Sequence, residues 1–388
     1  MATMLTIDQW VGKLSATKPI GSMTHWKRME KAFMLEAPDI TPVAPELDYW
    51  QMNYAGYTFP EIYNDDKKMT DACIRTWSDL RADAIWMYVD LGHEFDPMIS
   101  PEKRKEHFIL RGPRDYVMYK PVATTLEEAT RLFQEKVWEK YGWGRAGTDP
   151  GGFVSHCGQL LEFQRKMGNA VPIIVGSASP SNHAESTVEV QRFLKWMVTQ
   201  PKQRMHDYLK LVLEERLGSL DGYRQFAAEQ GCAFFCEWGG ARTWGPRELE
   251  EFGEYDEIWM EKAKRTFRYP FWHICGQNLP AAIEWCAKTA QVCAVQYDMP
   301  YRPTGMTQIE FWEWASRKFA GRKCAMNGPT TQQCLHSTPD ELRALVRKYI
   351  EITTKHTTAV IMPGCELSAY TPVENVKALI ESARTGTG

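Results

Sequence analysis

Three side chains that can bind a metal lie at the ends of two apolar runs. His273 and Cys275 close the run Phe271–Cys275, and Cys365 follows the run Ala359–Met362. Zinc takes imidazole and thiolate ligands, and its structural sites are usually closed by four protein ligands, whereas its catalytic sites keep one position open. Two sulfurs and one nitrogen therefore predict a zinc ion that takes part in chemistry.

Two other interpretations of these three residues stay open. They are ordinary reduced side chains, or they hold a structural zinc whose fourth ligand is Glu237, Asp298 or Glu366. Cys232 and Cys236 form a second pair with metal-like spacing, but the apolar residues between them favour a place in the core.

The elements that position these side chains are short apolar runs separated by stretches of helical length. Near-continuous hydrophobicity over five to seven residues is typical of strands buried on both faces of a parallel sheet. Strands alternating with helices predict a (β/α)₈ TIM barrel in the α/β class. The runs are Thr41–Pro45, Ala84–Asp90, Val171–Ser177, Cys232–Trp238, Phe271–Cys275, Val292–Asp298, Lys323–Asn327 and Ala359–Met362.

The barrel prediction brings polar residues from distant runs to one mouth, because active sites of such barrels lie at the carboxyl ends of the strands. Glu237 and Asp298 end apolar runs, where a buried carboxylate is costly unless it is paired, protonated or bound to metal. We expect both to be catalytic, with a hydrogen bond to a barrel loop as the alternative. Ser177 and Asn327 at strand ends, and Asn182 in a polar loop, are expected to contact the substrate.

Aromatic residues are unusually frequent, at 12% of the chain with 15 tryptophans. Much of this aromatic surface belongs in the core, but the surplus also suits a wall for a flat or apolar ligand. Tyr49, Trp50 and Trp238 are the candidates for such a wall.

The chain of 388 residues is expected to form a single domain over residues 1–388, longer than the ~250 residues typical of the fold because of additions. These are an N-terminal helical extension over residues 1–38 and a large insertion over residues 91–170, after the second strand. Within the insertion, His107–Leu110 and Tyr116–Lys120 flank a turn and predict a hairpin. The Gly-rich stretch Gly142–Gly152 is typical of a loop that moves or covers substrate.

Composition excludes several classes of function. A net charge of -3 provides no basic surface for nucleic acid or anionic lipid, and no apolar run approaches the ~20 residues that span a bilayer. Without an apolar signal segment at the N-terminus, the ten cysteines are expected to be reduced and the protein cytoplasmic. The sequence contains neither a P-loop nor a Gly-x-Ser-x-Gly elbow, which leaves nucleotide-dependent and serine-hydrolase chemistry without support. A monomer and a homodimer both stay open.

Several segments between about residue 24 and residue 384 resemble the uroporphyrinogen decarboxylase-like superfamily, and the C-terminal ones resemble its corrinoid-dependent zinc methyltransferase branch. The segments that carry the resemblance are Arg28–Phe33, Glu36–Val43, His273–Gly276, Gln296–Asp298, Met326–Gly328, Gly364–Glu366 and Thr371–Val376. The resemblance also implies a (β/α)₈ barrel. Decarboxylases of the superfamily carry an arginine-rich motif near the N-terminus, whereas the equivalent stretch here, Pro45–Met52, has two acids and no arginine.

The resemblance implies that His273, Cys275 and Cys365 bind Zn²⁺ and that the corrinoid (cobalamin) is carried by a partner protein. The implied reaction moves a methyl group from a small methylated substrate to the Co(I) corrinoid of that partner. The aromatic surplus favours an aryl methyl ether, which would make the protein an O-demethylase. Three alternatives stay open: a second-step enzyme that passes methyl from the corrinoid to a thiol or tetrahydrofolate, a decarboxylase-like lyase, and a non-catalytic binding module.

Overall fold

A computed structural model describes residues 4–62, 65–86, 108–110, 117–119, 121–137, 153–230, 235–240, 243–275, 279–299 and 304–385. Its strands are β1 (Ile85–Trp86), β2 (Phe108–Leu110), β3 (Val117–Tyr119), β4 (Ile173–Ala178), β5 (Phe235–Gly239), β6 (Tyr269–Ile274), β7 (Ala294–Tyr297), β8 (Cys324–Asn327) and β9 (Ala359–Ile361).

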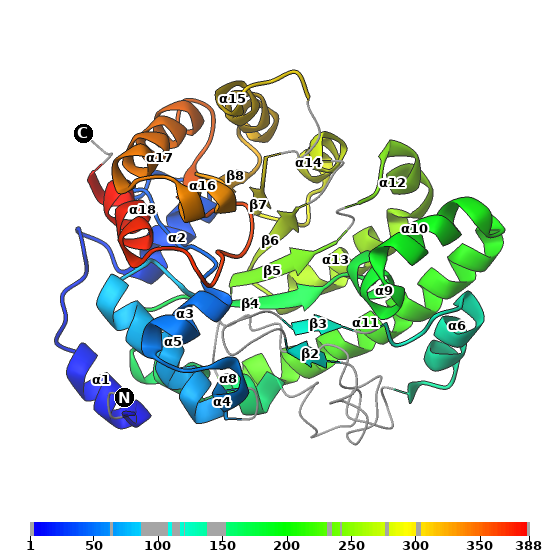
Figure 1. The fold of residues 1–388 in the computed structure, drawn as a ribbon, viewed down its shortest axis with the longest axis horizontal. Helices are drawn as coiled ribbons and strands as arrows, with labels where there is room; N and C mark the ends of the chain where they lie inside the picture. Colours follow the sequence, from blue (N-terminus) through cyan, green and yellow to red (C-terminus); the bar gives the residue numbers. More distant parts are fainter. Residues whose placement is uncertain are drawn as a thin grey trace.

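Seven of these strands form one parallel sheet, in the order β1, β4, β5, β6, β7, β8, β9. Residues 42–44 fill the remaining gap, since Val43 makes a parallel bridge to Ile361 of β9 and its carbonyl accepts the N–H of Asp83 ahead of β1. The sheet is therefore closed into the (β/α)₈ barrel that the sequence predicts, and Figure 1 shows helices around it. Each predicted apolar run overlaps one strand or this closing segment.

Helices cover the outside of the barrel, and several begin with the capping signals present in the sequence. Thr338 caps a helix that has Pro339 in its first turn, and Glu341 returns a hydrogen bond to the cap. The helices are α1 (Ile7–Leu14), α2 (His25–Phe33), α3 (Asp48–Ala55), α4 (Phe59–Ile62), α5 (Asp66–Leu80), α6 (Leu126–Gln134), α8 (Phe153–Lys166), α9 (Pro180–Val188), α10 (Val190–Thr199), α11 (Lys202–Gln230), α12 (Pro246–Phe252), α13 (Glu254–Thr266), α14 (Leu279–Lys288), α15 (Gln308–Phe319), α16 (Thr331–His336), α17 (Pro339–Thr353) and α18 (Val373–Thr385).

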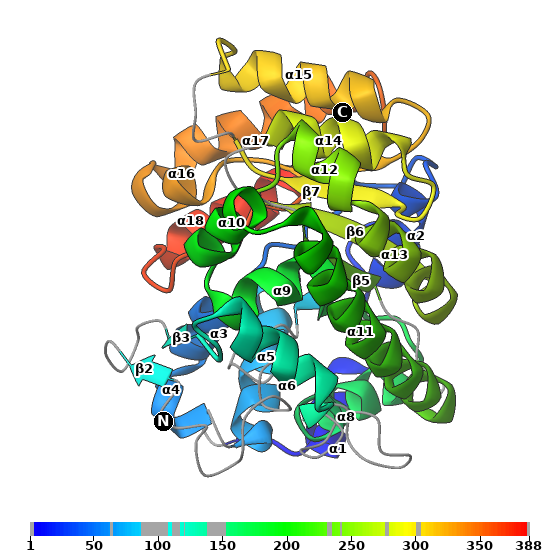
Figure 2. The same ribbon diagram turned by 90° about the vertical axis from the view of Figure 1, so that its right-hand side faces the viewer.

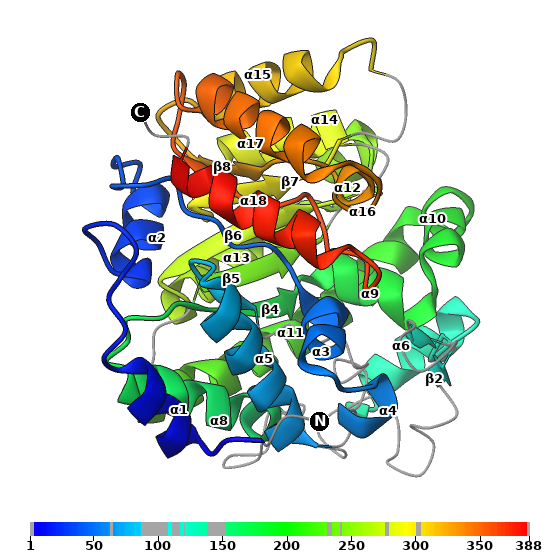
Figure 3. The same cartoon turned by 60° about the vertical axis from the view of Figure 1, so that its left-hand side comes forward.

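The segment that leads into the last helix contacts the N-terminal part of the chain. In Figure 3, α18 lies between α17 and α3. The indole N–H of Trp50 in α3 donates to the carbonyl of Thr371, just ahead of α18, at 2.7 Å. This contact links the segment after the first strand position to the segment after β9.

The predicted hairpin is present as β2 and β3, which pair antiparallel between β1 and β4 in sequence. Figure 2 shows it on the side of the barrel that carries α3 and α16, opposite α2. Both α3 and α16 follow the carboxyl ends of strands, so the hairpin belongs to the mouth side. The Gly142–Gly152 loop lies outside the described residues. Among the described helices, none is long and apolar enough to cross a membrane.

The barrel interior changes from apolar to polar along the strands. Phe271, Ala294 and Cys324 are register partners on β6, β7 and β8, and they belong to one buried apolar cluster. Two residues further along, His273 of β6 pairs in register with Gln296 of β7. Polar side chains therefore enter the barrel at its carboxyl end, where a TIM barrel carries its chemistry.

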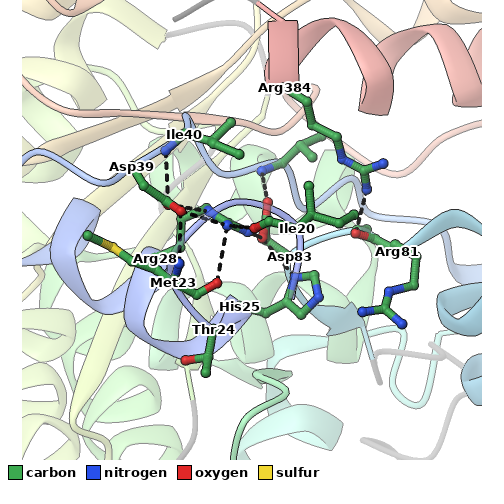
Figure 4. Close-up of polar contacts among 12 residues, drawn as sticks. Ile20, Met23, Thr24, His25, Arg28, Asp39, Ile40, Arg81, Asp83 and Arg384 are labelled. Carbon is green, nitrogen blue, oxygen red and sulfur yellow. Dashed lines mark hydrogen bonds and ion pairs between the residues drawn. The ribbon is translucent and has the colours of Figure 1, made fainter. Parts of the chain in front are cut away.

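The opposite, amino end of the barrel is closed by a buried ionic cluster, drawn in Figure 4. Arg28 of α2 donates to Asp39 at 2.8 Å and to Asp83 at 2.5 Å, and His25 Nδ1 lies 2.9 Å from the same Asp83 carboxylate. The other oxygen of Asp83 accepts the backbone N–H of Val43 at 2.9 Å. The cluster therefore ties the N-terminal extension to the start of the barrel.

Candidate metal centre at the barrel mouth

His273 and Cys275 are placed by the last residues of β6. The His273 ring is 6% exposed, and its Nε2 atom lies 3.1 Å from the Cys275 sulfur. Residues two apart on a strand lie on the same face. Both side chains therefore face the same side of β6, within reach of one ion.

Cys365 is brought to the same point by a tight contact between two loops. Gly364 packs against the residue that follows β7, and a Cβ added to it would lie 2.3 Å from the Asp298 Cα atom. No other residue has room at this position, so glycine is what allows the loop after β9 to reach β7. The N–H of Leu367 donates to the Glu46 carbonyl at 2.9 Å and holds the far end of the loop.

These three residues form a compact group of ligand atoms. The imidazole nitrogen of His273 and the sulfurs of Cys275 and Cys365 all lie within 4.8 Å of one another. Tetrahedral zinc with Zn–S of about 2.3 Å and Zn–N of about 2.0 Å separates its ligand atoms by roughly 3.5–4 Å. The donor types and their spacing thus fit zinc. Within the described part of the chain, no other group of three or more such residues gathers in this way.

Behind the three ligands lies a buried polar pair, Gln296 and Glu46. Gln296 Oε1 lies 2.9 Å from His273 Nδ1, on the side of the ring away from Cys275. Gln296 Nε2 donates to the Pro363 carbonyl at 2.9 Å and to a Glu46 carboxylate oxygen at 3.2 Å. Metal-binding histidines usually donate their second ring N–H to such a partner, which orients the ring.

The electrostatics of the centre favour a bound cation. Burial raises the pKa of Glu46, although the nearby His273 opposes this. A hydrogen bond with Cys275 and burial together raise the pKa of the Cys365 thiol well above its usual range. The carboxyl group of Glu46 and the thiol of Cys365 therefore lie in their neutral forms beside Cys275. A divalent cation would reverse this, since a coordinated thiol loses its proton.

Asp298 is the predicted catalytic residue that lies beside this centre. It is buried directly after β7, and burial raises its pKa to about 6, with the nearby Cys275 adding to the effect. Its carboxylate accepts the N–H of Met299 at 2.7 Å. The side chains of Glu237 and Trp238, predicted as catalytic and substrate-binding, lie outside the described residues, although their backbones belong to β5.

Two of the predicted substrate-binding residues lie on elements at the mouth. The sequence places Asn182 in a polar loop, but it lies in the first turn of α9, which Ser179 caps directly after β4. A Cβ added to Gly239 would lie 3.2 Å from the side-chain nitrogen of Asn182. Because Gly239 pairs in register with His273, Asn182 lies near the candidate centre. Ser177 is buried in β4 opposite Trp238.

The remaining three predicted residues use their side chains within the protein. Asn327 accepts the Trp312 indole N–H at 3.3 Å and donates to the Tyr297 carbonyl. Trp50 belongs to the main core cluster, and Tyr49 belongs to a smaller buried apolar cluster. These packing roles leave their predicted part in substrate binding untested.

Sequence reasoning did not select Glu46 or Gln296 for the site. The sequence does contain an indication of both residues. Gln296 is the polar residue within the apolar residues 292–297, and Glu46 directly follows the first strand run. A polar side chain at a position buried by the strand pattern needs a partner. Gln296 and Glu46 need such a partner for the same reason as Glu237 and Asp298.

Comparison with known proteins agrees with the fold. The family model described as uroporphyrinogen decarboxylase (URO-D) matches residues 148–386, which is more than half of the chain. Among solved structures, a methyltransferase from Methanosarcina mazei is similar, with a TM-score of 0.69, 18% sequence identity, and coverage of 95% of this chain and 100% of that one. No curated protein sequence matches. The matched residues include β6, β7, β9 and all three candidate ligands, and the chain belongs to the uroporphyrinogen decarboxylase (URO-D) family.

Proposed function

We propose that this protein is a zinc-dependent methyltransferase that moves a methyl group from a small methylated substrate to the Co(I) corrinoid of a partner protein. The observation that carries the proposal is the convergence of His273, Cys275 and Cys365 within 4.8 Å of one another at the mouth of the barrel. The structural similarity to a protein named as a methyltransferase from Methanosarcina mazei supports it.

The chemistry follows from the donor set. Zinc bound by these residues would supply a Lewis acid for the heteroatom that carries the methyl group. The two cysteines must lose their protons to bind it, and His273 must offer a free ring nitrogen. Asp298, whose pKa burial raises to about 6, would exchange a proton with the heteroatom.

The reaction balances without an added oxidant or reductant. In an ether, the C–O bond breaks and its electron pair stays on oxygen, which takes up one proton. The methyl carbon accepts a new electron pair from Co(I) of the partner, and cobalt is thereby oxidised to Co(III). The residues of this chain contribute by holding the ether oxygen at the cation and by excluding water.

Decarboxylation of a polycarboxylate is less well supported, despite the family name. The buried carboxyl group of Glu46 occupies the mouth, in a stretch without arginine. A substrate with several carboxylates would find no arginine there to pair with. A second-step enzyme that delivers methyl to a thiol or tetrahydrofolate would use the same three ligands, so the direction of transfer must be assayed.

We propose an aryl methyl ether as the methyl donor. Trp50, Trp86, Trp244 and Trp272 are all buried in the apolar clusters. The choice of an aryl methyl ether therefore depends on the aromatic surplus in the sequence and not on a described aromatic wall.

The test is methylation of free cob(I)alamin under anaerobic conditions, followed by absorbance. Methoxylated aromatics, methanol and methylamines would be offered separately, and methylcobalamin with a thiol or tetrahydrofolate would be offered for the reverse step. We expect methylation with a methoxylated aromatic, lost in Cys365→Ser. Transfer in either direction that persists undiminished in this variant would refute the metal mechanism.

A further inference from the structure

The ligands of the candidate centre come from two separate parts of the chain, and one buried side chain touches both. His273 belongs to β6 and Cys275 follows that strand directly, whereas Cys365 belongs to the loop after β9. Gln296 contacts His273 through its oxygen at 2.9 Å and the Pro363 carbonyl of the Cys365 loop through its nitrogen at 2.9 Å. It is fully buried, so no water competes for these bonds.

The orientation of the Gln296 amide follows from its partners. The Pro363 carbonyl can only accept a hydrogen bond, so the amide nitrogen must face it. The amide oxygen then faces His273 Nδ1, which must carry the ring proton. In the neutral ring, the other nitrogen, Nε2, then carries no proton, and it faces the Cys275 sulfur at 3.1 Å. That is the form of histidine that binds a metal.

We infer that Gln296 is a positioning residue that fixes His273 in its metal-binding tautomer and holds the Cys365 loop in register with β6. The inference rests on the proposed metal site, but it concerns a residue outside the ligand set. Glu46 completes the arrangement, because it accepts the second hydrogen of the same amide at 3.2 Å. One neutral side chain thus joins the three segments that meet at the mouth.

The test compares two buried glutamines. Gln296→Met keeps the length of the side chain but removes its hydrogen bonds. Gln164→Met is the matched control, because Gln164 is equally buried and donates to the Val171 carbonyl at 3.0 Å, at the start of β4 and away from the mouth. Zinc affinity of each metal-free protein would be measured by competition with a chromophoric chelator, and folding by circular dichroism.

We expect Gln296→Met to bind zinc about 10- to 100-fold more weakly than wild type, as for other second-layer contacts, and Gln164→Met to bind as wild type. Equal affinity of wild type and folded Gln296→Met would overturn the inference while leaving the proposed function intact. A wild type that binds no zinc would instead remove the proposed function.

A second measurement needs no Gln296 variant. In metal-free wild type labelled with ¹⁵N-histidine, the His273 signals, assigned by their loss in His273→Asn, should report a proton on Nδ1. A proton on Nε2 would overturn the inference whether or not zinc binds. This measurement also decides the case if Gln296→Met does not fold.

Discussion

The two ends of this barrel use charge in opposite ways. At the amino end, Arg28 is placed between Asp39 and Asp83, so that opposite charges face one another in a buried cluster. At the carboxyl end, two thiols and the carboxyl group of Glu46 meet around His273, and the described side chain that joins them, Gln296, is neutral. The charges at the amino end are thus balanced within the protein, while the carboxyl end would gain stability from a bound cation.

Proton binding follows the same division. Although burial opposes ionisation, hydrogen bonds and charge from Arg28 lower the pKa of Asp39 to about 2. On the mouth side, burial raises the pKa of Asp298 to about 6 and that of Asp256, which holds the loop after β4, also to about 6. Carboxyl groups thus have a lowered pKa at the amino end and raised pKa values on the mouth side.

The largest effect is expected when a cysteine at the mouth is replaced by serine, with a cysteine at the amino end as the control. Cys275→Ser removes a ligand at the mouth and should abolish zinc binding and methyl transfer. Cys293→Ser, ahead of β7 at the amino end, should leave both unchanged. Zinc content and the rate of cob(I)alamin methylation would be measured for both variants. Equal losses in both variants would remove the distinction between the ends.

The next largest effect should appear in stability alone. Arg28→Met removes the cation that pairs with the buried Asp83 and the partly buried Asp39, which should lower the free energy of unfolding by about 3–5 kcal/mol. Urea unfolding measures this, and the folded variant should bind zinc as wild type does. The control is Arg343→Met, because Arg343 pairs on the surface with Asp340 and should cost no more than about 1 kcal/mol. A similar loss for both arginines would contradict the assignment of the buried cluster.

A smaller effect is expected from the contact that positions Cys365. Gly364→Ala forces its new Cβ against Asp298, so the loop must move, at a cost of about 1–3 kcal/mol and with weaker zinc binding. In Gly218→Ala the new Cβ meets nothing within 4 Å, and the helix should become more stable by about 0.5–1 kcal/mol. Thermal unfolding and chelator competition test both. Unchanged zinc affinity in Gly364→Ala would show that the loop is not held where we place it.

The two ends should also differ in the sign of their pH dependence. Asp39 has a lowered pKa, so its contribution is present above about pH 4 and is lost as pH falls towards 2. Asp256 has a raised pKa, so the folded state holds a proton that the unfolded state loses, and stability falls as pH rises from about 4 to 6. Each contribution is about 2–3 kcal/mol.

Urea unfolding at a series of pH values would resolve these contributions. Asp39→Asn should flatten the acid limb, and Asp256→Asn should flatten the window between about pH 4 and 6. A variant with the slope of wild type in its own window would contradict the assigned protonation state.

The sequence was sufficient to predict the barrel, because buried parallel strands leave continuous apolar runs and even the short closing segment at residues 42–44 has one. The sequence also predicts His273, Cys275 and Cys365 as metal ligands, because their residue types and their positions at strand ends can be read from the sequence. The structure brings their donor atoms within 4.8 Å of one another. The amphipathic pattern over Glu248–Arg265 predicts a single helix, whereas the structure has two, α12 and α13, which meet at Gly253. Glycine weakens a helix, but periodicity alone does not show that it ends one.

The contacts behind the ligands could not be predicted in the same way. Glu46 and Gln296 are 250 residues apart in the chain, and the local sequence around either residue does not indicate that the other is its hydrogen-bond partner. Residue type alone does not reveal the partner of a side chain either, as Trp50 shows. Its aromatic character suggested a ligand wall, whereas its indole N–H bonds to the backbone of Thr371. A strand pattern indicates which side chains face inward, but not which polar groups meet there.

The most direct test of the account is the metal content of anaerobically purified wild type, measured beside Cys365→Ser. The account predicts about one zinc per chain in wild type and none in the folded variant. A folded wild type without zinc, unable to take it up when it is supplied, would contradict the central claim that the carboxyl end of this barrel is a metal centre.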